Sequence, residues 1–298
     1  MQNAGMAALK LDWRYLAFEV HPDDLGAALE GAKRMKFIGL NLTVPHKLLA
    51  VEMVDVLDES ARAWGAVNTV LFEGRDESGV WRPLREFGDA PREVRSRGFN
   101  TDAEAVTRAL REDLGLEVAG ARVLLLGAGG AGRTAALKLA SEKAAELFLV
   151  NRTRSKAEAL AEEIRQRWPR VKVAVGYPPG APNSVSARKQ GASSRRNGVR
   201  RSQTIDLVLN ATSLGLTPDD PLPLDETRFS LGQAAAVYDT IYRPAESPLL
   251  KWAIAAGCRV ANGLGMLLYQ GAKALEIWSG QSAPLEAMRR ALEKNVYA

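Results

Sequence analysis

The chain has 298 residues, of which 46% are hydrophobic and 25% are charged, which is ordinary for a soluble globular protein. Its length predicts about two domains. No apolar run approaches the ~18 residues of a membrane span, which excludes an integral membrane protein.

The cysteine content and the first residues indicate a cytoplasmic protein. Asp12, Arg14 and Glu19 interrupt the apolar residues near the N-terminus, so we expect no secretory signal peptide. Cys258 is the only cysteine and lies in an apolar run, where a buried structural thiol is expected. No Cys/His cluster has the spacing of metal ligands, so no metal is expected.

The net positive charge of the chain comes from the segment between Gly176 and Thr204. This segment contributes +6 to a total of +5, so the remainder of the chain carries about −1. It is rich in Pro, Gly and Ser, and Tyr177 is its only aromatic residue. Because single-stranded nucleic acids stack on aromatic side chains, we expect a surface insertion and no nucleic-acid partner. The basic residues are Arg188, Lys189, Arg195, Arg196, Arg200 and Arg201.

The first hundred residues alternate between strand-like and helix-like patterns. Pro45 suits the first turn of a helix. Residues 75–98 mix six Arg with five acidic residues, which predicts a solvated loop. The expected strands are 13–20, 37–42 and 66–72, and the expected helices are 22–35, 45–54 and 58–64.

The rest of the chain repeats strand and helix in turn, which predicts parallel βαβ units and an α/β fold. A helix is expected over 102–114, and two amphipathic helices over 264–278 and 284–293. Between them we expect strands near 123–126, 147–150, 171–175, 206–210 and 235–239, and helices near 131–143 and 155–168.

A glycine-rich loop follows the first of these strands. Gly127 allows a tight turn, Gly129 lets the backbone approach a pyrophosphate, and Gly132 lets helix and strand pack closely. The pyrophosphate then lies on free N–H groups at the positive end of the helix. The order of strand, loop and Ala-rich helix predicts a dinucleotide site, with a purely structural turn as the alternative.

The end of the next strand indicates which dinucleotide is bound. An NAD site usually has an Asp or Glu here to hold the ribose 2′-hydroxyl, but this chain has Asn151, Arg152 and Thr153. A carboxylate would repel a 2′-phosphate, whereas a guanidinium can pair with it bidentately. We therefore expect NADP(H).

Short motifs from Asn41 almost to the end of the chain resemble those of the shikimate dehydrogenase family, within the shikimate/quinate 5-dehydrogenase superfamily. They follow the family's order and approximate spacing, which makes the resemblance specific. The motifs are Asn41–Lys47 (NLTVPHK), Gly65–Thr69 (GAVNT), Asn100–Asp102 (NTD), Gly127–Ala131 (GAGGA), Asn151–Thr153 (NRT), Asn210–Ser213 (NATS), Asp239–Pro244 (DTIYRP), Gly263–Met266 (GLGM) and Tyr269–Gly271 (YQG).

The resemblance implies a two-domain α/β fold. An α/β substrate domain is expected over 1–101, a Rossmann-type NADP-binding domain over 102–262, and C-terminal helices over 263–298 that return to the first domain. The implied activity is NADP-dependent, reversible reduction of 3-dehydroshikimate to shikimate in chorismate and aromatic amino-acid synthesis. A quinate/shikimate dehydrogenase of catabolism and a non-catalytic NADP-binding paralogue are the alternatives. Whether the chain forms a homodimer is left open.

Lys47 and Asp102 are the expected catalytic pair. Hydride transfer from an alcohol requires a group that removes the hydroxyl proton. His21 lies at a strand–helix junction, and His46 would point about 100° away from Lys47 on a helix. A lysine beside a carboxylate can relay a proton and stabilise a developing alkoxide. The resemblance assigns these roles to Lys47 and Asp102, and an ordinary solvated lysine is the alternative.

The resemblance also implies a substrate pocket of short polar groups, as a ligand with three hydroxyls and a carboxylate requires. Asn68 could equally be a turn residue. The positions that match hydroxyl-binding residues are Thr43, Asn68, Asp102 and Gln270, and Tyr242 matches a residue near the substrate.

The cofactor residues implied by the resemblance lie on several loops. Thr212 and Ser213 could instead cap a turn, and Gly265 and Met266 could be a helix start with a core methionine. The expected residues are Gly127, Ala128, Gly129, Gly130, Ala131, Asn151, Arg152, Thr153, Lys156, Thr212, Ser213, Gly265 and Met266.

The start of the chain departs from the resembled family. Members usually begin with a strand and a Ser-x-Ser loop ahead of a His-Asn pair, and the two hydroxyls hold the substrate carboxylate. This chain begins Met1-Gln-Asn-Ala about where that pair falls, without the strand and the serines. We expect either a true start upstream, which the loss of a sheet strand favours, or weak shikimate binding and reduced stability.

Overall fold

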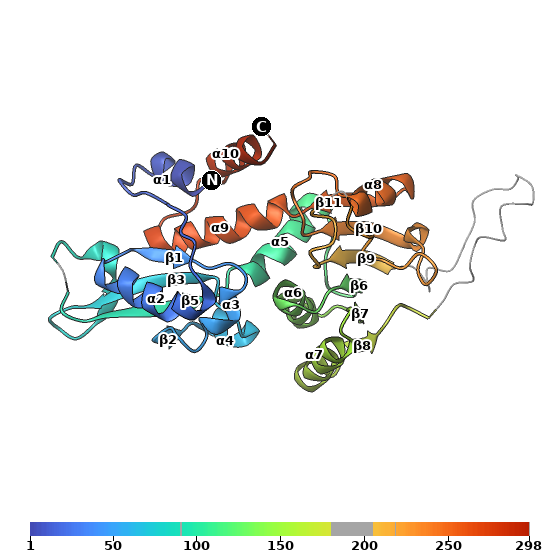
Figure 1. Cartoon of the computed structure of the whole chain (residues 1–298), viewed down its shortest axis with the longest axis horizontal. Helices are drawn as coiled ribbons and strands as arrows, with labels where there is room; N and C mark the ends of the chain where they lie inside the picture. Colours follow the sequence, from blue (N-terminus) through green and yellow to red (C-terminus); the bar gives the residue numbers. More distant parts are fainter. Residues whose placement is uncertain (90, 180–204, 218, 298) are drawn as a thin grey trace, which may run out of the picture. The chain divides into compact units, whose positions relative to one another are not determined.

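The computed structural model describes residues 1–89, 91–179, 205–217 and 219–297, which form two compact units (Figure 1). Unit 1 comprises Met1–Ala109 and Leu264–Ala298, and unit 2 comprises Leu110–Gly263. The basic residues expected to form a surface insertion lie outside the described residues. Within the described part, every helix is too short or too polar to cross a lipid bilayer.

Unit 1 contains a five-stranded mixed sheet with β3 at its centre. β5 lies on one side of β3, β1 and β4 lie on the other, and all three pairs are antiparallel. β2 pairs with β5 in parallel. Thr69 is opposite Asn41 of β1 and also opposite Phe99 of β5. The strands are β1 (Gly39–Asn41), β2 (Val56–Leu57), β3 (Thr69–Arg75), β4 (Trp81–Pro83) and β5 (Val94–Phe99).

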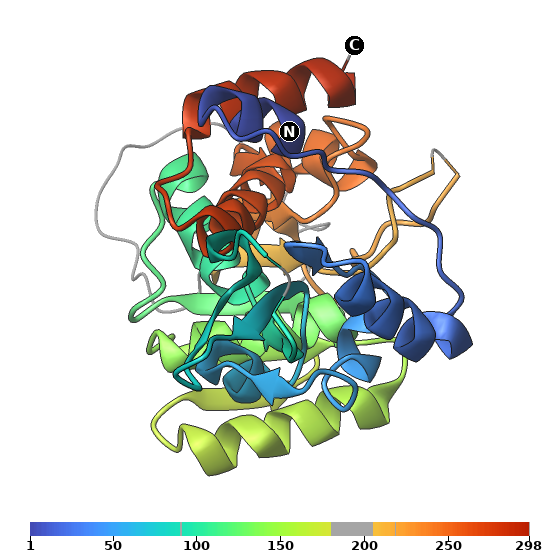
Figure 2. The ribbon, with the colours of Figure 1, turned by 90° about the vertical axis from the view of Figure 1, so that its left-hand side faces the viewer.

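Helices pack on this sheet through apolar stripes. Leu25, Leu29 and Ala32 recur at helical spacing on α2 and share a core cluster with Val70 and Phe72 of β3. α9 also contacts β3, and α1 lies beside α9 and α10 (Figures 1 and 2). The helices are α1 (Gln2–Ala8), α2 (Leu25–Arg34), α3 (His46–Leu49), α4 (Glu59–Trp64), α9 (Leu264–Ser279) and α10 (Leu285–Tyr297), with short 3₁₀ turns η1 (Pro22–Asp24) and η2 (Leu84–Glu86).

The strand predicted over 13–20 is wrong, because this segment has no regular structure. Part of its backbone forms hydrogen bonds with a side chain, and not with a neighbouring strand. The Asn3 Nδ2 donates to the Tyr15 carbonyl at 2.9 Å, and the Tyr15 N–H donates to Asn3 Oδ1 at 2.7 Å. Asn3 belongs to α1, a helix that the sequence analysis does not predict.

The loop predicted over 75–98 is also wrong, because it contains β4 and most of β5. The charged residues of β5 have partners on neighbouring elements. Arg95 Nε lies 2.7 Å from Glu73 of β3, and an Arg97 amino group lies 2.9 Å from Asp58. Paired charges are tolerated on a sheet face, so a high charge content did not indicate a loop here.

The helix predicted over 45–54 is much shorter in the structure, where α3 ends at Leu49. The residues that follow Leu49 form a tighter turn. The N–H groups of residues 51, 52 and 53 donate to carbonyls three residues back. Such i→i+3 bonds frequently close the last turn of a helix.

Unit 2 contains a six-stranded parallel sheet in the order β11-β10-β9-β6-β7-β8. The chain leaves β6 toward β7 and β8, then returns to the other side of β6 with β9. This reversal creates the topological switch point at which open α/β sheets bind ligands. The strands are β6 (Arg122–Leu126), β7 (Glu146–Val150), β8 (Lys172–Val175), β9 (Ile205–Asn210), β10 (Ala234–Asp239) and β11 (Arg259–Asn262).

The central strands of unit 2 are buried on both faces. Leu124 and Phe148 share a cluster with Leu249 of α8. The alternate residues, such as Leu125 and Leu147, are also buried and face the opposite side. The helices of this unit are α6 (Gly130–Ser141), α7 (Arg154–Arg167) and α8 (Pro248–Ala255), with the 3₁₀ turn η4 (Leu231–Gln233).

The compact units divide the chain differently from the predicted domains. The predicted second domain covers 102–262, whereas unit 2 ends one residue later, at Gly263, and begins eight residues later, at Leu110. The reason is α5 (Asp102–Leu114), a continuous helix whose first eight residues belong to unit 1. Asp102 is therefore part of the same unit as Lys47.

Cys258 precedes β11 and is half-buried. Its Sγ lies 3.3 Å from the Leu231 carbonyl. Burial raises the pKa of this thiol, which disfavours the thiolate that a nucleophilic cysteine needs.

Candidate active site

Lys47 and Asp102 form an ion pair within unit 1. The Lys47 Nζ lies 2.8 Å from Asp102 Oδ2. Lys47 belongs to the four-residue helix α3, and Asp102 is the first residue of α5. Their side chains are 28% and 12% exposed, so a small molecule can reach them while much of the surrounding water is excluded. Partial burial strengthens such a pair relative to one in bulk water.

Asn100 orients Asp102 through the backbone. Its Oδ1 accepts hydrogen bonds from the N–H groups of Asp102 and Ala103, both at 3.1 Å. This is how a capping side chain satisfies the start of a helix. Asn100 Nδ2 donates to the Ala66 carbonyl at 3.1 Å. Because Asn100 caps α5, the Asp102 carboxylate remains available to Lys47.

Asn68 contacts the other oxygen of the same carboxylate. Its Nδ2 donates to Asp102 Oδ1 at 2.9 Å and to Thr101 Oγ1 at 2.9 Å. Its Oδ1 accepts from the Thr101 N–H at 2.8 Å. Asn68 is 1% exposed, so this amide is a fixed part of the site. We call the three side chains of Lys47, Asp102 and Asn68 the catalytic cluster, after the role predicted for Lys47 and Asp102.

Backbone hydrogen bonds join the loops that carry this cluster. The Val67 N–H donates to the Lys47 carbonyl at 2.8 Å, and the Leu42 N–H donates to the Asn68 carbonyl at 2.8 Å. The chain segment before α3 is thereby tied to the segment before β3. A proton donor, a carboxylate and an amide are held against one another, which is the constellation that proton transfer to and from an alcohol requires.

Two of the remaining predicted substrate residues, Thr43 and Gln270, make no hydrogen bond to the catalytic cluster within the described part of the chain. Thr43 lies between β1 and α3 with its side chain exposed, and its carbonyl accepts from the His46 N–H at 2.8 Å. Gln270 is half-buried on α9, and its Nε2 donates to the Leu267 carbonyl at 2.9 Å. Tyr242 belongs to unit 2, follows β10 and is 36% exposed.

The glycine-rich loop of unit 2 fits a bound pyrophosphate. Gly127 has a φ of +104°, and a Cβ there would lie 2.8 Å from the Ala211 carbonyl oxygen. A Cβ on Gly132 would lie 2.2 Å from the Gly127 carbonyl oxygen, whereas Gly129 and Gly130 face open space. α6 begins directly after Gly129 without a side-chain cap, which leaves its first N–H groups for an anion.

Asn151 connects this loop to the end of β7. Its Oδ1 accepts from the Ala128 N–H at 2.9 Å, and its Nδ2 donates to the Thr153 carbonyl at 2.8 Å. The side chain therefore positions the two loops that would flank a nucleotide. Thr153 is the N-cap of α7, and its side chain makes no capping hydrogen bond.

The basic side chains near the end of β7 differ in their partners. Arg133 pairs with Glu163 at 2.8 Å and Arg154 pairs with Glu158 at 2.7 Å. In the described part of the chain, no carboxylate pairs with Arg152 or Lys156, and both are exposed. The positive charges of Arg152 and Lys156 are therefore available to pair with a 2′-phosphate.

The turn after β9 is organised by Asn210. Its Oδ1 accepts from the Thr212 N–H at 3.0 Å and from Thr212 Oγ1 at 2.7 Å, while Ser213 is exposed. Asn210 Nδ2 donates to Asp239 Oδ1 at 2.9 Å. Burial raises the pKa of Asp239, although hydrogen bonds from Ser247 and other groups oppose that effect. Thr212 thus caps a turn at the switch point of the sheet.

Gly265 and Met266 lie in the first turn of α9, where Gly265 is buried and Met266 is half-buried. These two predicted cofactor residues belong to unit 1, whereas the glycine-rich loop belongs to unit 2.

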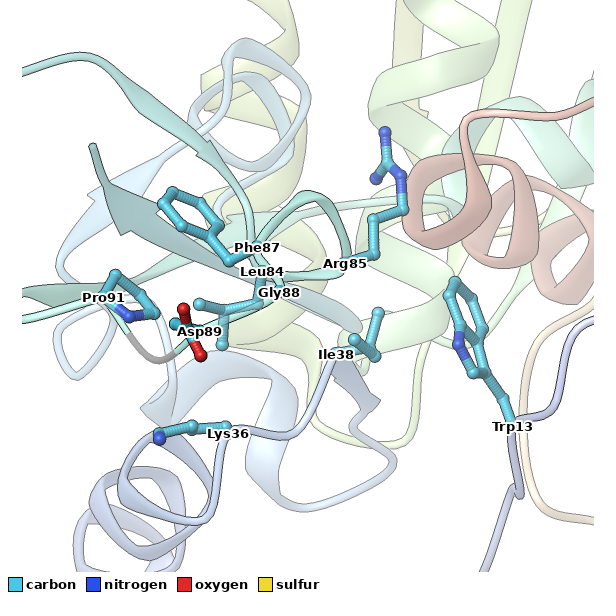
Figure 3. A pocket seen from close by; sticks show the side chains of 9 residues that line it. All are labelled: Trp13, Lys36, Ile38, Leu84, Arg85, Phe87, Gly88, Asp89 and Pro91. Carbon is cyan, nitrogen blue, oxygen red and sulfur yellow. The ribbon is translucent and has the colours of Figure 1, made fainter. Parts of the chain in front are cut away.

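Unit 1 also contains a cavity of about 330 Å³ (Figure 3). Trp13, Ile38 and Phe87 contribute apolar walls, and Lys36 and Asp89 contribute charges. None of the predicted site residues lines it.

Sequence reasoning missed the polar residues behind the catalytic cluster. Thr69 and Thr101 are 0% and 2% exposed. Thr69 directly follows Asn68, and Thr101 directly follows Asn100. The repeated Asn-Thr pair at the start of one strand and the end of another was the available signal. Polar residues in buried strands need partners, so this pattern predicts a hydrogen-bond network.

Three family models match the chain. The "Shikimate dehydrogenase substrate binding domain" matches residues 1–70, "Shikimate / quinate 5-dehydrogenase" matches 109–173, and the "Shikimate 5'-dehydrogenase C-terminal domain" matches 263–293. A curated relative from Methanopyrus kandleri, named shikimate dehydrogenase (NADP(+)), is 38% identical over 98% of this chain and 89% of its own length. The chain belongs to the shikimate dehydrogenase family.

Solved structures agree with this membership and with a Rossmann-type fold for unit 2. Shikimate 5-dehydrogenase from Thermus thermophilus, crystallised with NADP(H) and shikimate, matches with a TM-score of 0.72 and 30% identity. The match covers 98% of this chain and 92% of that one. The 5-ketofructose reductase of a Gluconobacter species matches with a TM-score of 0.73 and 32% identity, covering 99% and 92%.

Proposed function

We propose that this protein is an NADP-dependent shikimate dehydrogenase that reversibly reduces 3-dehydroshikimate to shikimate in the chorismate and aromatic amino-acid pathway. The observation that carries the proposal is the catalytic cluster, in which Lys47 Nζ lies 2.8 Å from Asp102 Oδ2. The curated relatives named shikimate dehydrogenase (NADP(+)) support the choice of substrate and coenzyme. We also propose that the enzyme works in a reducing cytoplasm.

The catalytic cluster supplies the proton chemistry of this reaction. In shikimate oxidation, the Lys47–Asp102 pair takes up the proton of the substrate hydroxyl. A bound nicotinamide coenzyme would supply the acceptor for the hydride that leaves the same carbon. The Lys47 ammonium stabilises the negative charge that develops on the substrate oxygen. In the reverse direction the same pair returns the proton to the carbonyl oxygen.

Several polar side chains would recognise the substrate. Asp102 is held rigidly, so it can bind a hydroxyl without losing side-chain freedom. The Asn68 amide is 1% exposed and already donates to Thr101 and Asp102, so it would bind a hydroxyl by exchanging one of these hydrogen bonds. Thr43 is exposed and close in sequence to Lys47. We assign hydroxyl binding to Thr43, Asn68, Asp102 and Gln270, and a contact near the substrate to Tyr242.

The coenzyme would lie across the switch point of unit 2. The open N–H groups at the start of α6 bind the pyrophosphate, and Arg152 pairs with the 2′-phosphate. We assign cofactor binding to Gly127, Ala128, Gly129, Gly130, Ala131, Asn151, Arg152, Thr153, Lys156, Thr212, Ser213, Gly265 and Met266.

A substrate and coenzyme panel tests the proposal. Purified protein is assayed for oxidation of shikimate and quinate and for reduction of 5-ketofructose, each with the NADP and NAD forms of the coenzyme. We expect the largest kcat/KM with shikimate and NADP⁺. A preference for quinate with NAD⁺, or for 5-ketofructose, would assign a different substrate to the same site. NADPH binding without turnover of any compound would indicate a non-catalytic paralogue.

A further inference from the structure

A series of side-chain hydrogen bonds leads from Tyr15 to the catalytic cluster. Tyr15 Oη donates to Asn41 Oδ1 at 3.1 Å. Asn41 Nδ2 donates to Thr69 Oγ1 at 3.1 Å, and Thr69 Oγ1 donates to Asn68 Oδ1 at 3.2 Å. Asn68 then donates to Asp102. All these residues belong to unit 1.

The direction of this series is fixed by the backbone. Asn41 Nδ2 also donates to the Asn68 carbonyl at 3.2 Å, and a carbonyl oxygen can only accept. The Asn41 amide therefore has one orientation, with its oxygen toward Tyr15. Because Thr69 Oγ1 accepts from Asn41, its single proton is left to point toward Asn68 Oδ1, or toward Thr101 Oγ1 at 3.4 Å.

The orientation of the Asn68 amide follows from these donors. Its Oδ1 faces the Thr69 hydroxyl and the Thr101 N–H, the second of which can only donate. The NH₂ group is thereby directed to Asp102 Oδ1. In the flipped orientation, the amide oxygen would face a carboxylate oxygen and no hydrogen bond could form between them.

We propose that Thr69 and Asn41 are positioning residues for the proton-transferring pair. They hold the Asn68 amide so that its NH₂ group binds one oxygen of Asp102 and leaves the other oxygen to Lys47. Thr69 is fully buried, so it acts on the reaction through Asn68 and touches no substrate. The consequence for turnover rests on the proposed function.

The Thr69→Val variant removes the hydroxyl and keeps the side-chain shape. It leaves Asn68 Oδ1 with one donor fewer and Asn41 Nδ2 with one acceptor fewer. We expect kcat for shikimate oxidation to fall about tenfold, as loss of a buried hydrogen bond predicts, with an unchanged KM for NADP⁺. The Thr69→Ser variant keeps the hydroxyl and should recover kcat to within about threefold of wild type.

Thr107→Val is the matched control. Thr107 is also buried in unit 1, but its hydroxyl bonds only to the Glu104 carbonyl of its own helix, at 3.4 Å. We expect this variant to keep the wild-type kcat. A second comparison uses Asn68→Ala, in which Thr69→Val should cause no further loss of kcat. Multiplicative losses in the double variant would overturn the proposal, since Thr69 would then act independently of Asn68.

Hydrogen exchange of the Asn68 side-chain amide gives a readout that needs no turnover. Its NMR signals are assigned by their loss in Asn68→Ala. We expect Thr69→Val to accelerate this exchange about tenfold or more, because it removes one of the bonds that hold the amide, and Thr107→Val to leave it unchanged. Asn41→Leu interrupts the same series at a half-buried position, and it replaces Thr69→Val if that variant does not fold.

Two outcomes separate this proposal from the proposed function. Unchanged exchange and unchanged kcat in Thr69→Val would overturn the positioning role even if the wild type oxidises shikimate. Accelerated exchange in a wild-type protein that turns over no shikimate would support the positioning role and overturn the assigned reaction.

Discussion

At the scale of single residues, the site combines groups that act on the substrate with groups that orient them. Lys47 is held by its ion pair with Asp102 and by the hydrogen bond between its carbonyl and the Val67 N–H. A lysine in a defined position contributes to catalysis in a way that a mobile surface lysine does not.

Replacing Lys47 by alanine should lower kcat for shikimate oxidation by about 10²- to 10⁴-fold, the range of general acid–base catalysis. The Kd for NADPH, measured by fluorescence titration, should change little, because Lys47 is not among the residues assigned to coenzyme binding. Lys273→Ala, at an exposed position of α9, is the control. A Lys47→Ala enzyme with wild-type kcat would remove Lys47 from the mechanism.

Replacing Arg152 by glutamine should weaken NADPH binding by about 10- to 100-fold, as loss of a charge-assisted hydrogen bond predicts. Binding of NADH, which has no 2′-phosphate, should stay the same. Arg154→Gln removes a neighbouring arginine that already pairs with Glu158, and it should leave both affinities unchanged. Equal losses of affinity for NADPH and NADH in Arg152→Gln would show that Arg152 does not bind the 2′-phosphate.

At the scale of elements, a few local features determine how the site is presented. Asp58 caps the start of α4, where its Oδ1 accepts from the Ser60 N–H at 3.0 Å, and Gly65, with a φ of +62°, follows the last residue of the helix. The loop that follows carries Val67 and Asn68 to the catalytic cluster. Asp58 is therefore a structural residue whose loss should be measurable as stability.

Asp58 should stabilise the protein in a pH-dependent way. Burial alone would raise its pKa, but hydrogen bonds from Ser60 and the Arg97 guanidinium outweigh burial and hold the pKa below 3.8. A carboxyl with a lowered folded-state pKa stabilises the fold above its unfolded pKa, and this contribution is lost as the pH falls through the folded pKa.

We therefore expect Asp58→Asn to lower the free energy of unfolding at pH 7 by about 1 kcal/mol, the scale of a helix cap. Urea unfolding between pH 7 and pH 3 should show the difference from wild type shrinking below about pH 4. A difference that stays constant across this range would mean that the ionised carboxylate has no part in it.

Gly132 is the second element-scale feature, because it allows α6 to pack against the glycine-rich loop. In Gly132→Ala the new Cβ would lie 2.2 Å from the Gly127 carbonyl oxygen, so the loop must move. We expect a loss of about 1–3 kcal/mol in unfolding free energy, as for an overpacked site. Gly129→Ala points into open space and should leave the melting temperature unchanged. Equal melting temperatures for the two variants would contradict this packing.

At the scale of the whole molecule, the sequence predicted unit 2 better than unit 1. The strands of unit 2 are continuous apolar runs, and its glycine loop has a recognisable order, so β6, α6 and β7 lie within a few residues of their predicted positions. In unit 1, β5 carries Arg95 and Arg97. Its strand character depends on Glu73 and Asp58 from other elements, which a local pattern cannot reveal.

The same distinction holds for the site. Lys47, Asp102 and Asn68 could be named from their motifs, and the structure brings these three into contact. Thr69 and Asn41 were missed because they act through hydrogen bonds between strands β1 and β3, whose register no local sequence pattern specifies. Periodicity and short motifs do not predict contacts between segments that lie far apart in the sequence.

The most direct test of the account is the rate of NADP⁺ reduction with shikimate, followed by the absorbance of NADPH, for the wild type and for Asp102→Asn. The variant keeps the size of Asp102, removes the charge that pairs with Lys47 and replaces one of its two acceptor oxygens by an NH₂ donor. The account predicts turnover by the wild type and a loss of about 10²-fold or more in the variant. A wild type without shikimate-dependent NADP⁺ reduction, or a variant with the wild-type rate, would contradict it.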